Sequence, residues 1–204
     1  MAFHECRRQP IDQRRRRHVP GELPRELIRD VRLRVLLGGE GGECLINGLF
    51  LGEDSQHLDN YMLVDHASPH CSSHQFYNGI LGGQAHGVFH GLILVRKDAQ
   101  KTDAKQTNRH LLLSDDAQID TKPQLEIYAD DVKCTHGATI GQIDEDALFY
   151  LRSRGLDESS ARGLLLFAFA GECLARMKPG PVLDHIKRIV HESLPEAIVS
   201  SGRG

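Results

Sequence analysis

Cysteine and histidine stand two residues apart at Cys134 and His136, inside the short apolar run Val132–Ile140. A run of this length is typical of a β-strand, in which the side chains of residues i and i+2 point to the same face. Thiolate and imidazole are both ligands for iron and zinc. Two ligands do not complete a tetrahedral site, so a stable metal centre needs further ligands, for example from another subunit. Spacing alone favours the structural alternative, a buried cysteine beside a hydrogen-bonded histidine.

Histidines number twelve in all, and three of them, His66, His70 and His74, are spaced at four with Cys71 among them. On a helix this spacing would place the imidazoles on one face, where they could bind zinc. The neighbouring proline and serines disfavour a helix, so we expect these histidines mainly in turns and structural roles. A stand-alone zinc-binding protein that uses His66, His70, Cys71 and His74 is kept as an alternative hypothesis.

Signatures of common enzymes fail in this sequence. The glycine-rich stretch at 38–43 is not followed by Gly-Lys-Ser/Thr, so it is not a phosphate-binding P-loop. The metalloprotease motif HExxH and the hydrolase motif GxSxG do not occur. Two acidic pairs, Asp115–Asp116 and Asp130–Asp131, leave open a β-helix enzyme that acts on polysaccharide, although adjacent strand residues point to opposite faces. We therefore predict that the chain is not an enzyme.

The elements that would position these residues are short strands. The 204 residues include 20 glycines, no tryptophan and only 5% aromatic residues, which suits thin repeated layers better than one thick core. Some strand-length runs lie about 16–18 residues apart, and residues 98–102 resemble residues 116–120, which indicates a solenoid. We predict a mainly β fold, a parallel β-helix. Its apolar runs are Leu33–Leu37, Cys44–Leu51, Tyr61–Val64, Val88–Val95, Leu111–Leu113, Leu125–Tyr128 and Val132–Ile140.

Three parts are predicted along the chain. Residues 1–30 form a basic leader that includes Arg14–Arg17 and is expected to be poorly ordered. Residues 31–142 form the β-helix core, which we expect to be truncated at its N-terminal end. Residues 143–196 form a helical domain whose middle helix is apolar all round at Leu164–Ala170, so it must be covered by its neighbours or by a partner protein.

Charge and cysteine usage bound the setting of the protein. The net charge is −3, and the main body is acidic, which argues against a nucleic-acid partner. No run of about 18 apolar residues is present, so we expect no membrane-spanning helix. Five widely spaced cysteines without a CxxC pair fit a reducing, cytoplasmic location rather than a disulfide framework.

Several segments resemble the SufB/SufD family of iron–sulfur cluster assembly proteins. The order Cys-x-His-Gly-Ala-Thr followed by Phe-Tyr-Leu-Arg-Ser-Arg-Gly is most like SufD. The resemblance extends over roughly residues 33–195 and corresponds to the C-terminal part of family members. The segments that carry it are Val64–His66, Gln100–Asn108, Leu111–Ser114, Lys122–Ile127, Asp130–Thr139 and Leu148–Gly155.

This resemblance implies a right-handed parallel β-helix (solenoid) followed by a small α-helical C-terminal domain. It implies a non-catalytic scaffold subunit that pairs with a SufB-like subunit and docks a SufC-like ATPase. His136, with Cys134 as a weaker candidate, matches the place where the nascent iron–sulfur cluster forms between the two scaffold subunits. Iron or cluster would be held there transiently, with no permanent cofactor. The expected partner-binding residues are Phe149, Tyr150, Arg152, Arg154, Leu165 and Phe169.

Overall fold

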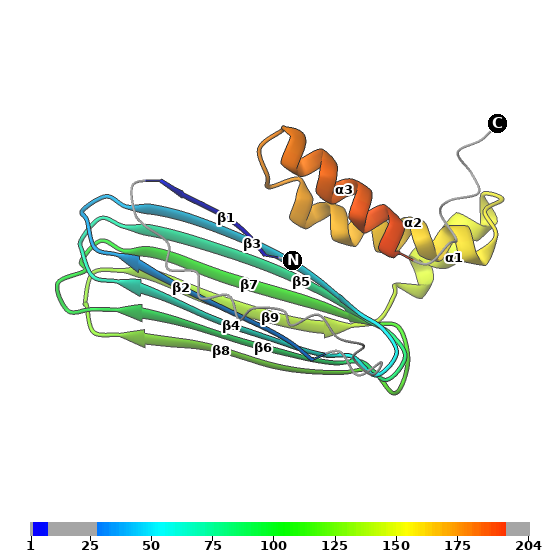
Figure 1. Ribbon diagram of the computed structural model, residues 1–204, viewed down its shortest axis with the longest axis horizontal. Coiled ribbons are helices and arrows are strands. Elements are labelled where there is room, and N and C mark those ends of the chain that lie inside the picture. The colour runs from blue at the N-terminus through cyan, green and yellow to red at the C-terminus, as the bar shows by residue number, and fades with distance from the viewer. Residues whose placement is uncertain (1, 8–27, 195–204) are drawn as a thin grey trace, which may run out of the picture. The chain divides into compact units, whose positions relative to one another are not determined.

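Strands precede helices along the chain, in a computed structural model that describes residues 2–7 and 28–194 (Figure 1). The chain divides into two compact units, Met1–Ile140 and Gly141–Gly204. In the described part of the first unit the strands are β1 (Ala2–Arg7), β2 (Ile28–Leu37), β3 (Glu43–Gly52), β4 (His57–His66), β5 (Ser72–Leu81), β6 (His86–Val95), β7 (Asp103–Leu112), β8 (Gln118–Ile127) and β9 (Lys133–Gly141).

Successive strands from β2 onward alternate between two sheets, so that two strands make one coil of a solenoid. One sheet has the order β1-β3-β5-β7-β9 and the other the order β2-β4-β6-β8. Ile28 pairs in parallel with His57, His57 with His86, and His86 with Gln118, so each coil advances by 29 or 32 residues in this sheet. The predicted solenoid of mainly parallel β-strands followed by helices is confirmed.

The repeat differs from the predicted spacing, which corresponds to one strand rather than one coil. β2 and β3 begin 15 residues apart, and β6 and β7 begin 17 residues apart. β5 was missed because polar side chains, Ser73 and Gln75 among them, interrupt its apolar pattern although both are buried. β1 was also missed; it pairs antiparallel with β3 inside the predicted leader, of which residues 8–27 lie outside the described part.

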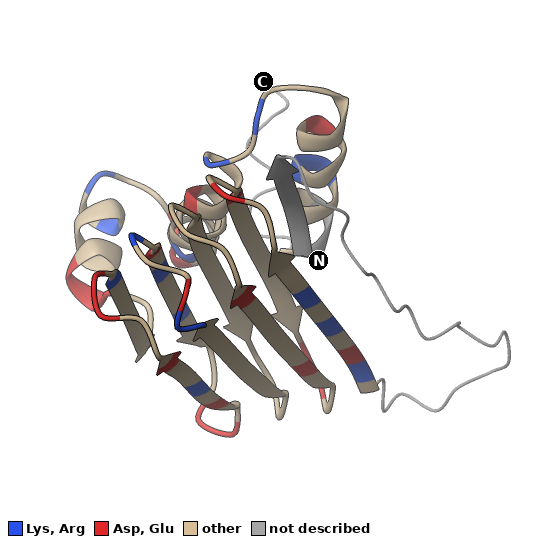
Figure 2. Ribbon diagram, turned by 90° about the vertical axis from the view of Figure 1, so that its left-hand side faces the viewer, with Lys and Arg blue, Asp and Glu red and all other residues tan. Residues whose placement is uncertain are grey.

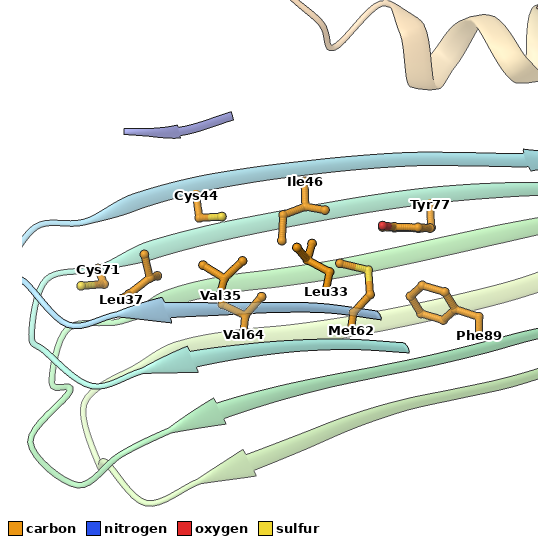
Figure 3. Packing of buried hydrophobic residues seen from close by; sticks show 10 residues of the cluster. All are labelled: Leu33, Val35, Leu37, Cys44, Ile46, Met62, Val64, Cys71, Tyr77 and Phe89. Atoms are coloured by element: carbon orange, nitrogen blue, oxygen red, sulfur yellow. The ribbon is translucent and has the colours of Figure 1, made fainter. Parts of the chain in front are cut away.

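Between the sheets lies a core of alternating side chains that point inward from both (Figure 3). Aliphatic residues of β2 and β4 meet Ile46 of β3, and the rings of Tyr77 and Phe89 lie 5.0 Å apart. Large residues stack on glycines of the next coil: a Cβ placed on Gly48 would lie 2.0 Å from the Tyr77 ring. The abundant glycines therefore make room for inward-pointing rings. The cluster comprises Leu33, Val35, Leu37, Cys44, Ile46, Met62, Val64, Cys71, Tyr77 and Phe89.

Charged residues avoid the central strands of the solenoid. β5 and β6 contain no Asp, Glu, Lys or Arg, whereas the edge strands β2 and β8 contain both signs (Figure 2). This distribution matches a surface in which edges are kept polar to limit unwanted strand pairing. No helix in the described ranges is long and apolar enough to span a membrane.

The second unit contains three helices, α1 (Glu145–Ser153), α2 (Glu158–Leu174) and α3 (Pro181–Ser193). Asp144 caps α1 by accepting hydrogen bonds from the N–H groups of Asp146 and Ala147, at 2.9 and 3.1 Å. Gly155 then takes a φ of +96°, which turns the chain toward α2. Within the unit, α2 contacts both α1 and α3.

Replacing Gly48 by alanine is expected to lower the free energy of unfolding by about 1–3 kcal/mol, because the new methyl group overlaps the buried Tyr77 ring. Urea unfolding measures this change. Gly137→Ala is the control, since nothing lies within 4 Å of its added Cβ, and it should change stability by less than about 1 kcal/mol. Equal stability of the two variants would contradict the described packing.

Candidate functional site

Cys134 and His136 lie on β9, the last strand of its sheet. The Lys133 N–H donates to the Thr102 carbonyl at 2.8 Å, just as the Asp103 N–H donates to the Cys71 carbonyl one coil earlier, at 3.0 Å. This repeated pattern aligns Cys134 with Ala104 and His136 with Gln106. Because Ala104 and Gln106 are buried and face the core, Cys134 and His136 continue two inward-facing rows at the open end of the solenoid.

Cys134 is half-buried and packs against a small apolar cluster that includes Ile93, Val95 and Ala104. Burial raises the pKa of its thiol; a backbone hydrogen bond at Ala104 lowers it, and the negative charge of Asp103 raises it further. The thiol is therefore protonated at neutral pH. It becomes a ligand only when a bound metal displaces the proton.

His136 is exposed, in contrast to the buried residues of the same row in earlier coils. Within the described ranges, no strand pairs with the far edge of β9. The imidazole is thus accessible from the direction in which a further coil, or another protein, would stack. The geometry brings together the thiol and imidazole that the motif indicated, and it places both at an exposed edge.

A row of buried polar side chains lies beneath these two residues, and sequence analysis missed it. Gln106 Nε2 donates to Gln75 Oε1 at 2.9 Å, and Thr121 Oγ1 donates to Asn108 Oδ1 at 2.9 Å. His110 Nε2 lies 3.2 Å from the same Asn108 oxygen. The signal for this row was present in the alternation of β7, where every second residue from Ala104 to His110 is buried.

The histidines of the zinc hypothesis point to different places. His66 is buried with Nε2 2.8 Å from Ser73 Oγ, whereas His70 occupies a corner with a φ of +59°. The Cys71 thiol donates to the Gly39 carbonyl at 3.3 Å, and half-exposed His74 lies 3.7 Å from Asp103. Among the residues that the structure describes, no group of three or more His, Cys, Asp or Glu side chains could hold a metal ion. The arrangement does not support the zinc alternative.

The acidic pairs of the polysaccharide hypothesis lie at corners of the solenoid. Asp115 and Asp116 are exposed between β7 and β8, and Asp130 and Asp131 are exposed between β8 and β9. The Asp131 side chain forms an ion pair with Lys101, and its carbonyl accepts the Lys101 N–H at 2.7 Å. These carboxylates serve the corner, and the two pairs are not gathered into one site.

A second candidate surface lies on α1. Phe149 and Tyr150 are 75% and 56% exposed, and Arg152 and Arg154 are exposed beside them. The Arg154 guanidinium lies 5.1 Å from the centre of the Tyr150 ring. An open cavity of about 580 Å³ adjoins these residues and is lined by Phe149, Arg152, Ser153, Leu156, Asp157 and Glu158.

The apolar residues of α2 separate into inner and outer positions. Phe169 is only 8% exposed, so the structure does not place it on a partner-binding surface, and Leu165 is half-buried. Leu164 is 45% exposed instead. The difference of one residue rotates a side chain by about 100° around a helix, so the phase of α2 decides which leucine faces outward.

Comparisons with known proteins agree with this architecture. Residues 14–169 match the family model described as the SUF system FeS cluster assembly, SufBD core domain. The chain is 40% identical over 159 residues to the iron–sulfur cluster assembly protein SufD of Escherichia coli K12, covering 78% of this chain and 38% of that protein. It is 38% identical over 185 residues to a SufBD family protein of Mycobacterium leprae, covering 86% and 47%. The chain thus spans less than half the length of these relatives.

Stability is expected to fall as the pH drops from about 6.5 to about 4. Burial lowers the pKa of His66 to about 4, against a smaller raising effect of Asp65, and burial lowers the pKa of His110 to about 4. In this window the unfolded chain takes up protons that the folded chain excludes, which removes up to about 3 kcal/mol per histidine.

Urea unfolding between pH 7.5 and 4.5 measures this dependence. The variant His110→Gln should lose part of the pH dependence, because its neutral amide does not titrate. The exposed His74 serves as the control through His74→Gln, which should keep the wild-type slope. A His110→Gln slope equal to that of wild type would show that His110 is not buried as described.

Proposed function

This chain belongs to the SufBD core family of iron–sulfur cluster assembly proteins, and we propose that it is a SufD-like, non-catalytic scaffold subunit. In this proposal it pairs with a SufB-like subunit and docks a SufC-like ATPase. The observation that carries the proposal is the placement of Cys134 and His136 together at the open last coil.

An incomplete ligand pair at an open edge supports a cluster site shared between subunits. Thiolate and imidazole suit iron, but an iron site needs more than two protein ligands to be stable. A partner subunit stacked against β9 would supply the rest and would also satisfy its outer row of backbone groups. The nascent cluster is cargo here, assembled between the subunits and then passed on.

The exposed aromatic and basic residues of α1 support docking of the ATPase on the helical unit. Phe149 and Tyr150 offer apolar area at the surface, and Arg152 and Arg154 offer positive charge beside it. Aromatic and arginine side chains are the residues that most often dominate protein–protein binding energy. Leu164 extends the proposed surface onto α2, and half-buried Leu165 lies next to it.

A cytoplasmic location completes the proposal. Cys44, Cys71, Cys134 and Cys173 are thiols rather than disulfides. Burial raises the pKa of the Cys173 thiol to about 12, against a smaller lowering effect of Arg176, and it also raises that of Cys71. Protonated, buried thiols are inert structural residues in a reducing compartment.

Replacing His136 by alanine is expected to reduce iron–sulfur cluster formation in the co-expressed complex by at least about 10-fold, because a ligand to the cluster is lost. Absorbance and iron and sulfide content of the purified complex measure it. Thr135→Ala, which alters the opposite face of the same strand, should form cluster normally. Normal cluster yield in His136→Ala would exclude His136 from the site.

The variant Phe149→Asp is expected to weaken binding of a SufC-like ATPase by about 30-fold or more, because a charge replaces an aromatic contact. Calorimetric titration of the purified chain with the ATPase measures this affinity. Val182→Asp introduces the same charge at a 63% exposed position on α3 and should bind like wild type. Equal losses in both variants, or none in either, would place the ATPase elsewhere.

A further inference from the structure

We propose that Gln106 is a positioning residue for His136, accepting a hydrogen bond from the imidazole Nδ1–H at its amide Oε1. Its importance for cluster assembly rests on the proposed function, whereas the hydrogen bond itself does not. The inference follows from the register of the coils, the direction of the Gln106 amide and the surroundings of His136.

The register places the two side chains next to each other. Gln75 pairs in parallel with Gln106, and the hydrogen bond from Lys133 to Thr102 continues the same alignment from β7 to β9. Ile46, Gln75, Gln106 and His136 therefore form one inward-facing row. Neighbouring strands lie about 4.8 Å apart, a separation that the amide of a glutamine side chain readily bridges.

The direction of the Gln106 amide is fixed by its other hydrogen bond. Gln106 Nε2 donates to Gln75 Oε1 at 2.9 Å, toward the preceding coil. In a ladder of stacked glutamines, the N–H and C=O groups of each amide point in opposite directions along the stack. Gln106 Oε1 consequently faces the β9 side, where the next member of the row is His136.

That oxygen is buried and lacks a hydrogen-bond partner in the structure. Gln106 is only 1% exposed, so water does not readily substitute for a protein donor. A buried acceptor without a donor costs about 1–3 kcal/mol, and an apolar residue of the same size would avoid that cost. The retention of an amide here is explained if the oxygen receives a proton donor from the last coil.

The surroundings offer His136 few other polar partners. On the facing sheet, a Cβ on Gly91 would lie 2.2 Å from Gln106 Nε2, so Gly91 is the residue opposite Gln106. Gly91 pairs with Pro123, which is therefore opposite His136 and has no polar side-chain atom. Along β9, the same-face neighbours of His136 are Cys134 and Ala138. The Gln106 oxygen is the strong acceptor within this set.

Donation from Nδ1 follows from the shape of the imidazole. Nδ1 is the ring nitrogen nearer the backbone, and so nearer the side chain aligned with it on the next strand, whereas Nε2 is at the tip. Holding the proton on Nδ1 leaves the Nε2 lone pair unprotonated and directed out of the open coil. A second residue that fixes the tautomer in this way is the usual accompaniment of a metal-binding histidine.

The test is the tautomer of His136 in the full chain, labelled with ¹⁵N-histidine and recorded by long-range ¹H–¹⁵N correlation at pH 8. The His136→Asn variant assigns the resonance. We expect the Nδ1–H tautomer in wild type and a shift to the Nε2–H tautomer, the preferred form of free imidazole, in Gln106→Met. Gln75→Met makes the same chemical change one coil farther away and should keep the Nδ1–H tautomer.

An Nε2–H tautomer in wild type would overturn the inference without the need for any variant. So would a Gln106→Met spectrum that retains the Nδ1–H form, or identical losses in the two methionine variants, which would indicate a general structural effect. Normal cluster formation by His136→Ala would overturn the proposed function instead, while a tautomer that depends on Gln106 would still stand.

Discussion

Parallel, in-register pairing between coils is the constraint on which the other features depend. Every residue of β2 to β6 is aligned with a residue 29 to 32 positions later, so side chains stack in rows that run from coil to coil. Large and small residues must then alternate along a row, as Tyr77 does with Gly48. The many glycines and the missing tryptophans of the sequence are consequences of this stacking.

The same rows determine what happens where the coils stop. In the middle of the solenoid a polar inward residue such as Gln75 is covered by the next coil and must find a partner inside. At β9 the row ends in Cys134 and His136, which keep the inward direction but lie at the surface. A thiol, an imidazole and an unpaired strand edge are thereby presented together, a combination suited to building a cluster between two subunits.

Much of the solenoid followed from the sequence because apolar runs are local signals. β3, β6 and β9 coincide closely with predicted runs, and the helix caps at Asp144 and Asp157 lie where expected. β5 and most of β7 escaped because their buried residues, such as Asn108, are polar. The Cys134–His136 pair was found from its motif, but its alignment with Gln106 depends on pairing between distant strands. Likewise, only the phase of α2 distinguishes exposed Leu164 from buried Phe169.

The central claim, that β9 is the open edge of an in-register solenoid, is tested most directly by residue-resolved amide hydrogen exchange of β9, alone and with a SufB-like subunit. Lys133 donates to β7, so Thr135 and Gly137 should also exchange slowly in the chain alone, while Cys134 and His136 should exchange fast. Binding of the SufB-like subunit should slow the fast pair. Uniform protection of β9 in the chain alone, or no change upon binding, would contradict the account.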